Sequence, residues 1–543
     1  MIRDLLVAGL RSAAVDEGLT PPEEIGLEQP ANREHGDWSS NIALATANSA
    51  GTNPRELAGR LIDRLEQQGL ADVERLEVAG PGFINFHLAE TWLHDVLGTV
   101  INQGVESYGR SNIGSGRRVI VEFVSANPTG PLHAGHGRGA IFGDALATLL
   151  EWCGYVVTRE TYINDRGAQM QTYAASLAAR AAGETPPDDG YMGQYIIDWA
   201  AEMPADADPL EWGYARAIAD QKEVLASLGV EFDVWFSEKS LVDNGELDSS
   251  LTALRDRGVV FDDDGAVWLR SSEFGDDKDR VLKKSDGEYT YVMPDIAYHA
   301  NKFDRADELI DVFGADHHGY INRMRAAMAS LGHDPDSLDF QITQLVKLMR
   351  GSEEVKLSKR SGDLVELRDV VEEVGADSTR FTYLLQSIDS QQTFDLEAAA
   401  AQAMDNPVFY TQYAHARIVS IGRKAAEAGI ERLPLADVDL SLLTHPREIE
   451  VLRSLFAGAD SIAVAGRERA PHRVAGWLRE LAAAFHGFYH DCYVIGDGVS
   501  PELTQARLWL TEAARIGLVV GLTILGVSAP DAMWIDDKTD DDA

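Results

Sequence analysis

The sequence predicts an α/β protein built around a doubly wound parallel sheet, with a small α/β domain before the sheet and an all-α helical bundle after it. Three observations support this prediction. Between about residues 111 and 390, strand-like and helix-like stretches alternate repeatedly, which favours a parallel sheet. The first 110 residues mix the two patterns on a smaller scale, with helix-like spacing at 41–50 and 55–68 and a strand-like run at 78–87 that is broken by Pro81-Gly82. From about residue 395 to Gly526, the apolar residues recur at helical spacing.

Composition limits the class of protein. A chain of 543 residues has room for about three domains. Its two cysteines, Cys153 and Cys492, exclude a disulfide scaffold and a cysteine-rich zinc site, and they fit a reducing cytoplasm. The amphipathic start lacks the apolar core of a signal peptide, and no apolar run approaches the ~20 residues that span a bilayer. We therefore expect a cytoplasmic protein that binds no membrane, with residues 518–527 forming a buried helix end.

The net charge of −40 arises from 88 acidic and 48 basic residues. Such a surface repels polyanions, which argues against broad, non-specific binding of nucleic acid. A nucleic-acid partner would need locally positive patches. Only 11 of the basic residues are lysine, so a cluster of lysines is unusual in this chain.

Residues 117–155 are the most informative stretch. Residues 119–124 form an apolar, β-branched run that predicts a buried strand, and residues 125–131 form a turn rich in Pro and Gly. Residues 132–152 follow with helical spacing. A strand, a turn and a helix start in this order present backbone N–H groups and the positive end of the helix dipole, which favour a phosphate.

The turn ends in His133-Ala134-Gly135-His136. Two histidines at i and i+3 face the same way in a first helical turn, and Gly135 and Gly137 leave room for a ligand against the backbone. The plain alternative is a glycine-rich helix start whose histidines pack locally. That alternative weakens because the strand, the turn and the helix all accompany the motif.

Two later stretches also carry polar groups that suit phosphate. The predicted strand at residues 308–313 ends in Gly-Ala-Asp-His-His-Gly-Tyr, so Asp316 and His318 follow the carboxyl end of a strand, where open α/β sheets bind ligands. Residues 354–362 form a basic loop with Lys356 and Lys359. Most basic loops are solvated surface, but two lysines in a four-residue window are less ordinary in a chain with so few.

These stretches resemble class I aminoacyl-tRNA synthetases. Residues 125–136, Ser-Ala-Asn-Pro-Thr-Gly-Pro-Leu-His-Ala-Gly-His, resemble the HIGH signature in the extended form found in arginyl-tRNA synthetases. The basic loop resembles the KMSKS motif, with Leu357 in place of Met and Arg360 in place of the last Ser. Residues 34–41 resemble a stretch of the extra N-terminal domain of that family, although on the residues alone a plain packing domain is equally consistent. Residues 367–377 are similar to the family as well.

The resemblance implies a two-step reaction with L-arginine, ATP with Mg²⁺, and tRNA(Arg). The arginine carboxylate attacks the α-phosphate of ATP, and the 2′-hydroxyl of the terminal adenosine then takes the acyl group. The implied catalytic residues are His133, His136, Lys356 and Lys359. The implied ATP-binding residues are Gly135, Gly137, Asp316, His318, Leu357 and Ser358, and no protein metal site is expected.

Recognition of arginine needs carboxylates and a hydroxyl in the plane of the guanidinium. The resemblance assigns Glu238, Tyr291 and Asp295 to that role, and Ser125 and Asn127 to the α-amino and carboxylate ends. Asp and Tyr residues in such loops often only cap helices, which is the alternative for each of them. A site that must satisfy guanidinium rejects smaller amino acids by ~10⁴ or more, so no editing domain is needed.

The expected domains are residues 1–110, which contact the tRNA elbow, a Rossmann-type catalytic domain at 111–394 with a helix-rich insertion at about 165–255, a helical anticodon-binding domain at 395–530, and an acidic tail at 531–543. Within the insertion, residues 232–238 form an aromatic and acidic edge with strand-like alternation, and residues 265–270 begin the second half of the nucleotide fold. We expect a monomer. Three other functions remain open: another class I synthetase, a small nucleotidylyltransferase with an HxGH loop, and a catalytically silent RNA-binding paralogue.

Overall fold

The computed structural model describes residues 2–28, 30, 32–315, 318–355 and 365–534. The chain divides into two compact units. The first comprises Met1–Asn102, Glu431–Phe456 and Phe488–Ala513, and the second comprises Gln103–Ile430, Ala457–Gly487 and Ala514–Ala543. Three long helices contribute residues to both units: α17 (Pro446–Glu468), α18 (Pro471–Asp491) and α19 (Pro501–Leu525).

The first unit contains a small antiparallel sheet in the strand order β1-β2-β4-β3. The predicted helices at 41–50 and 55–68 are confirmed as α2 and α3, and the predicted strand at 78–87 is the end of β3, the turn at Pro81-Gly82 and most of β4. The elements are α1 (Ile2–Asp16), β1 (Leu27–Glu28), β2 (Trp38–Ser40), α2 (Ile42–Ala50), α3 (Pro54–Gln68), β3 (Val73–Ala79), β4 (Phe83–Leu88) and α4 (Trp92–Ser107), of which residues 103–107 lie in the second unit.

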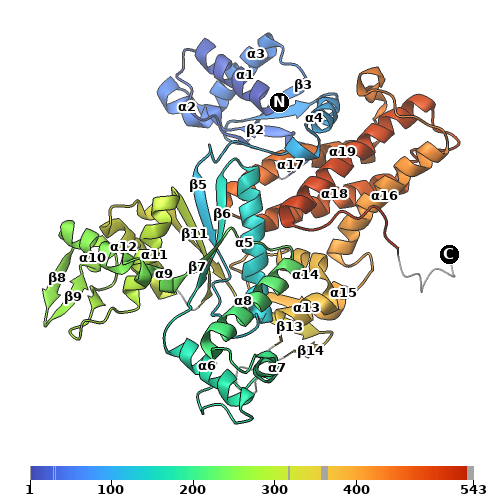
Figure 1. The fold of residues 1–543 in the computed structure, drawn as a ribbon. Helices are drawn as coiled ribbons and strands as arrows, with labels where there is room; N and C mark the ends of the chain where they lie inside the picture. Colours follow the sequence, from blue (N-terminus) through green and yellow to red (C-terminus); the bar gives the residue numbers. More distant parts are fainter. Residues whose placement is uncertain (1, 29, 31, 316–317, 356–364, 535–543) are drawn as a thin grey trace. The chain divides into compact units, whose positions relative to one another are not determined.

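The second unit is organised by a five-stranded sheet in the order β12-β11-β5-β6-β7, with every neighbouring pair parallel. This confirms the predicted doubly wound sheet (Figure 1). Its strands are β5 (Arg118–Glu122), β6 (Val156–Ile163), β7 (Val234–Ser237), β11 (Glu308–Gly314) and β12 (Leu338–Thr343).

Alternation along β5 determines what covers each face of the sheet. Ile120 belongs to the core formed with α11 (Val292–Arg305) and α12 (His318–Ser330), so the even-numbered side chains face these helices. On the other face, Phe123 lies against Gly143 of α5 (Ala134–Trp152), where a Cβ would come within 2.2 Å of its ring. Gly143 therefore allows the helix that follows the histidine motif to lie close to the sheet.

The second unit contains further helices and two smaller sheets. The helices are α6 (Ala168–Ala181), α7 (Gln194–Glu202), α8 (Pro209–Ser227), α9 (Glu238–Asp243), α10 (Glu246–Asp256), α13 (Leu367–Val374), α14 (Ala376–Tyr383), α15 (Leu396–Ala400) and α16 (Pro407–Glu427). The strands are β8 (Val260–Asp263), β9 (Ala266–Leu269) and β10 (Arg280–Lys283), which form one small sheet, and β13 (Val346–Arg350), β14 (Glu353–Glu354) and β15 (Gln392–Asp395), which form another.

Two expectations about the middle of the chain are wrong. The aromatic and acidic stretch around residue 235, expected inside the insertion, is the edge strand β7 of the parallel sheet. Residues 265–270, expected to begin the second half of that sheet, form β9 of a separate antiparallel sheet. The alternating burial of β9 is typical of a strand with one solvated face, whereas both faces of β5 are covered.

A buried arginine joins three helices on the α5 side of the sheet. Arg380 of α14 donates from Nε to the carbonyl of Leu525 (2.9 Å), from one terminal nitrogen to the carbonyl of Leu228 (2.9 Å), and from the other to Asp144 Oδ2 (2.5 Å). The first two partners lie at the ends of α19 and α8, and Asp144 lies on α5. A planar guanidinium with several donors suits this junction.

The C-terminal region is helical, as predicted. Residues 518–525 end α19, and its apolar side chains there are buried, in agreement with the predicted buried helix end. Within the described residues, α19 is also the one helix that is long and apolar enough to cross a membrane by length and composition, contrary to the expectation of no such run. Because 72% of its apolar window is buried inside the protein, its apolarity is explained by packing.

Candidate active site

The candidate site lies at the carboxyl ends of β5 and β11, which are neighbours in the sheet. The chain leaves β5 through α5 toward β6 on one side, whereas β11 and β12 lie on the other. Strand order therefore reverses between β5 and β11. Ligands of doubly wound sheets bind at this reversal, outside the carboxyl ends of the strands.

The turn after β5 is held by groups from α7 and α8. Gln221 Nε2 donates to the carbonyls of Asn127 (3.1 Å) and Gly130 (3.2 Å), and the Tyr195 hydroxyl donates to the carbonyl of Thr129 (3.0 Å). The side chain of Asn127 itself is exposed. These contacts fix the backbone that leads to the histidine motif.

The start of the same turn is strained. Val124 and Ser125 have φ values of 72° and 41°, in the left-handed region that non-glycine residues seldom adopt. Such a residue costs of order 1–3 kcal/mol and persists where its surroundings determine it. The Ser125 hydroxyl donates to Glu122 Oε1 (2.7 Å) and accepts from the N–H of Tyr162 (3.2 Å). Ser125 is therefore held at the end of β5 in a single orientation.

The two histidines lie together at the start of α5. Their rings stack, with centroids 3.7 Å apart and planes inclined by 26°. The N–H of His133 donates to His136 Nδ1 (3.2 Å), so a neutral His136 carries its proton on Nε2 and donates from there. A Cβ on Gly135 would come within 2.9 Å of the His133 ring. Glycine at this position therefore allows the stacked arrangement.

The residues that flank the basic loop lie against the histidine segment. The N–H of Ala134 donates to the carbonyl of Val365 (2.9 Å), and the N–H of Leu367 donates to the carbonyl of Leu132 (2.8 Å). Val355, on the other side of the loop, and Val365 both pack against the apolar cluster that contains Ala134. The predicted loop residues Lys356, Leu357, Ser358 and Lys359 lie outside the described residues.

The two predicted carboxyl groups of the guanidinium site both have raised pKa values. Burial raises the pKa of Glu238, while a hydrogen bond from Tyr162 and the charge of Arg166, 3.6 Å away, oppose that shift. Burial and, to a smaller extent, the charge of Glu238 raise the pKa of Asp295 to about 7, while the charge of His299 and a hydrogen bond with Tyr320 oppose the shift. Two carboxyls that resist ionisation favour a cationic ligand, because that ligand would stabilise their charged forms.

Other predicted residues are placed differently. Tyr291 stands at the N-cap of α11 with 95% of its side chain exposed, so its role at the guanidinium stays a prediction. Asp316 lies outside the described residues, and His318 begins α12. Sequence reasoning missed Tyr162 and Tyr320, which contact the two carboxyls. The position of Tyr162 in β6, on the same face as the other polar groups, is a signal only once the strand order is known.

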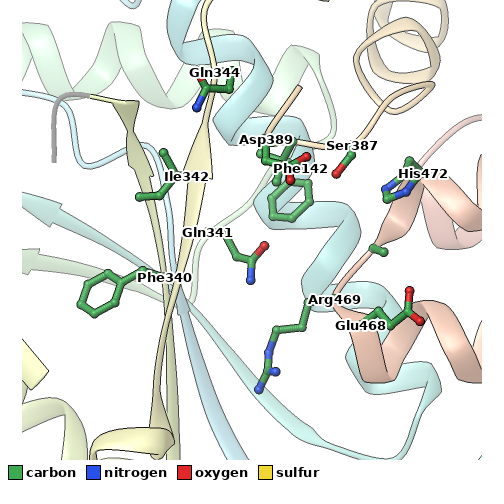
Figure 2. A pocket seen from close by; sticks show the side chains of 12 residues that line it. Phe142, Phe340, Gln341, Ile342, Gln344, Ser387, Asp389, Glu468, Arg469 and His472 are labelled. Atoms are coloured by element: carbon green, nitrogen blue, oxygen red, sulfur yellow. The ribbon is translucent and has the colours of Figure 1, made fainter. Parts of the chain in front are cut away.

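A separate cavity of about 380 Å³ lies away from these residues. Figure 2 shows Ser387, Asp389 and His472 on one side of it and three residues of β12 on the other. None of the predicted site residues lines it. Its lining is Phe142, Phe340, Gln341, Ile342, Gln344, Ser387, Ile388, Asp389, Glu468, Arg469, Ala470 and His472.

Comparisons with known protein families match almost the whole chain. Residues 1–88 match the arginyl tRNA synthetase N terminal domain, residues 99–188 and 214–418 match the class I (R) tRNA synthetase catalytic domain, and residues 411–533 match the DALR anticodon binding domain. The three matches follow one another along the chain in the order that the sequence predicts.

Individual proteins agree with these matches. The chain is 43% identical to the arginine–tRNA ligase of Bacillus subtilis over 98% of this chain and 99% of that protein. Among solved structures, it resembles a putative arginyl-tRNA synthetase from Campylobacter jejuni with a TM-score of 0.74 and 31% identity, covering 82% of this chain and all of the other. The arginyl-tRNA synthetase of Thermus thermophilus has the same TM-score at 24% identity and covers 98% of this chain and 100% of that one, which supports the fold.

Proposed function

The chain belongs to the arginyl-tRNA synthetases of class I, and on this basis we propose how its residues carry out the arginine–tRNA ligase reaction. The arginine carboxylate attacks the α-phosphate of ATP and expels pyrophosphate. The 2′-hydroxyl of the terminal adenosine of tRNA(Arg) then attacks the acyl carbon of arginyl-adenylate and expels AMP. Both steps develop charge on phosphate oxygens, so the enzyme needs fixed donors and cations more than a covalent group.

We propose that the stacked histidines and the lysine loop act on the phosphates from two sides. His133 and His136 donate to the α-phosphate as it becomes five-coordinate, and Lys356 and Lys359 neutralise the departing pyrophosphate. The observation that carries this proposal is the hydrogen bond between Ala134 and Val365, because Val365 directly follows the segment 356–364 that contains both lysines. This hydrogen bond attaches Val365, the first described residue after that segment, to the histidine motif.

ATP would lie over the start of α5. In this proposal Gly135 and Gly137 let the nucleotide approach the helix N-terminus, and Asp316, His318, Leu357 and Ser358 contribute further contacts. Mg²⁺ enters with ATP and is held mainly by its phosphates. Among the residues that the structure describes, no group of three or more His, Cys, Asp or Glu side chains could hold a metal ion.

We propose that Glu238, Asp295 and Tyr291 bind the guanidinium of arginine. Ser125 and Asn127 then hold the α-amino and carboxylate ends. Support comes from the raised pKa values of both carboxyls, which arise mainly because burial disfavours their charged forms in the free protein. A planar cation with five donors compensates it, whereas a neutral side chain of similar shape would leave buried acceptors unpaired.

The remaining assignments follow the family. We propose that residues 1–110 contact the tRNA elbow, that 111–394 form the catalytic domain, that 395–530 read the anticodon, and that 531–543 are an acidic tail. The helix-rich insertion that begins at about residue 165 would end before β7, because β7 belongs to the parallel sheet. The enzyme would act as a cytoplasmic monomer. We also propose that activation of arginine requires bound tRNA.

The test is exchange of labelled pyrophosphate into ATP, measured with each amino acid in the presence and absence of tRNA(Arg). We expect exchange with arginine and not with other amino acids, and we expect tRNA to enhance it strongly. Exchange driven better by another amino acid would refute the arginine assignment in favour of another class I synthetase. Equal exchange without tRNA would refute the tRNA requirement alone.

A pair of lysine variants tests the loop. Lys359→Ala should lower the turnover number by at least tenfold with little change in the KM for arginine. Lys347→Ala is the matched control, because Lys347 lies on β13, where it pairs with Glu354 at 3.2 Å at the surface. An unchanged rate for Lys359→Ala would remove the loop from the mechanism.

A further inference from the structure

Three carboxylates form a row across the centre of the parallel sheet. Glu122 of β5 is in register with Asp311 of β11 on one side and with Glu160 of β6 on the other. All three are buried, with exposed fractions of 3%, 0% and 0%. They share the face that is covered by α11 (Figure 1). Like charges directly opposite one another on neighbouring strands are destabilising, so this row needs compensation.

Two cations of α11 supply that compensation. Lys302, which is fully buried, donates from Nζ to Glu122 Oε2 (2.7 Å) and to Asp311 Oδ1 (2.7 Å). Arg305 donates to both oxygens of Glu160, at 2.5 and 2.9 Å. Lys302 therefore forms ion pairs with two of the carboxylates, whereas Arg305 pairs with one.

The Lys302 contacts continue to the candidate site in both directions. On one side, Glu122 accepts from the Ser125 hydroxyl at 2.7 Å. On the other, His299 Nε2 lies 2.8 Å from Asp311 Oδ2, and His299 Nδ1 lies 2.8 Å from the backbone carbonyl of Asp295. Lys302 is thus the central member of a hydrogen-bonded path that begins at Ser125 and ends at Asp295.

The contacts of Arg305 and its partner Glu160 involve neither Ser125 nor Asp295. Glu160 also accepts from the hydroxyl of Tyr298 at 2.8 Å, and Arg305 Nε donates to Asn301 Oδ1 at 3.0 Å. The two cations therefore lie on the same helix, one turn apart, and neutralise the same row of carboxylates. The Lys302 path joins the two predicted ends of the arginine site, whereas the Arg305 contacts lead to other residues of α11.

We propose that Lys302 is a positioning residue for arginine, because it holds Glu122 and Asp311 together and so sets the distance between Ser125 and Asp295. This inference rests on the proposed function, in which Ser125 binds the main-chain end of arginine and Asp295 binds the guanidinium. Arginine has a fixed length between those ends when extended. A site whose two ends are tied through a buried cation accepts that length and positions the carboxylate toward the α-phosphate.

A stability role alone does not require this arrangement. Buried ion pairs can often be replaced by apolar side chains without loss of stability, because removing charge from water is costly. The nitrogen of Lys302 has two carboxylate partners, Glu122 and Asp311. Glu122 accepts from Ser125, and Asp311 contacts His299, which contacts the backbone of Asp295. If Lys302 positions arginine, its removal should raise the KM for arginine more than the KM for ATP. If Lys302 only stabilises the fold, its removal should not affect the KM for arginine selectively.

The test compares Lys302→Met with the control Arg305→Met. Methionine keeps the unbranched, apolar length of lysine and removes the charge. We expect Lys302→Met to raise the KM for arginine at least tenfold while the KM for ATP changes less than twofold. We expect Arg305→Met to change neither KM by more than twofold. Because KM does not depend on the amount of active enzyme, a partly folded preparation still reports it.

A second variant covers the case in which Lys302→Met does not fold. Lys302→Met combined with Asp311→Asn removes one of the two facing carboxylates together with the lysine. We expect this double variant to recover thermal stability while its KM for arginine stays raised at least tenfold. If the double variant recovers both its thermal stability and a normal KM for arginine, only charge balance matters and the inference is overturned. The inference is also overturned if Lys302→Met leaves the KM for arginine unchanged, or raises the KM for arginine and the KM for ATP equally.

Asp295→Asn separates this inference from the proposed function. If Asp295→Asn leaves the KM for arginine unchanged, the arginine site itself is wrongly assigned. If Asp295→Asn raises that KM and neither Lys302 variant does, the arginine site stands and the positioning role of Lys302 is refuted.

Discussion

Replacing Asp295 by Asn should make the free protein more stable at alkaline pH and weaken its binding of arginine. Burial and the neighbouring charge of Glu238 raise the pKa of Asp295 from its ordinary value of 3.8 to about 7. Between these two values the folded protein binds more protons at this carboxyl than the unfolded chain does. The free energy of unfolding therefore falls as the pH rises from about 4 to about 7.

The magnitude follows from the size of that interval. Each pH unit corresponds to 1.36 kcal/mol, so holding Asp295 ionised in the free protein costs up to about 4 kcal/mol above pH 7. Asn cannot ionise and avoids this cost. The stabilisation by Asp295→Asn should grow from near zero at pH 4 toward that limit at pH 8.

Binding of arginine should change in the opposite direction. The guanidinium binds the ionised carboxylate, and about one tenth of Asp295 is ionised at pH 6 if its pKa is about 7. The wild-type KM for arginine should therefore be about tenfold higher at pH 6 than at pH 8. In Asp295→Asn the KM should be at least tenfold higher than the wild-type value at pH 8 and should lose this dependence on pH.

The assays are thermal unfolding without ligands and arginine-dependent pyrophosphate exchange with tRNA, each at pH 6, 7 and 8. Asp304→Asn is the matched control, because Asp304 lies on the same helix with an exposed side chain. It should change neither stability nor KM appreciably. Lower stability of Asp295→Asn at pH 8, or a KM within twofold of the wild type, would show that the buried carboxyl does not act in this way.

Three further predictions concern the phosphate site and its support. His136→Asn should lower the turnover number in aminoacylation by about 10²–10³ with little change in either KM, because it removes a donor to the developing charge; a loss confined to KM would contradict this. Gly137→Ala should lower the turnover number several-fold, since its Cβ would come within 2.7 Å of Leu367 beside the lysine loop, and an unchanged rate would show that this contact yields freely. Arg380→Met should lower the free energy of unfolding by about 3–5 kcal/mol in denaturant titration, because it removes the closest cation from Asp144, which keeps only Arg159 at 3.5 Å, and takes the donor from two buried backbone carbonyls; a loss below about 1 kcal/mol would contradict this.

The histidine motif and its supporting elements were predictable from the sequence because their signals are local. The apolar run of β5, the Pro-Gly turn and the helical spacing after Leu132 lie within about thirty residues, and each constrains its own backbone. The same is true of the hairpin around Pro81-Gly82. A local pattern of this kind specifies an element without knowledge of its neighbours in space.

The role of β7 and the row of buried carboxylates could not be predicted in the same way. A four-residue strand at the edge of the sheet looks like any short apolar segment until its partner β6 is known. Glu122, Glu160 and Asp311 stand on three separate strands, and only the register of those strands brings them into one row. Lys302 reads as an ordinary helix-surface lysine, because its two partners lie 180 and 9 residues away in the chain.

The most direct test of the proposed arginine and phosphate sites is a crystal structure with a non-hydrolysable analogue of arginyl-adenylate. We predict that the guanidinium lies within hydrogen-bond distance of Asp295 and Glu238, and that the phosphate-like group is bound by His133 and His136 with Lys359 on its far side. A guanidinium bound away from both carboxylates, or a phosphate-like group out of reach of both imidazoles, would contradict this prediction.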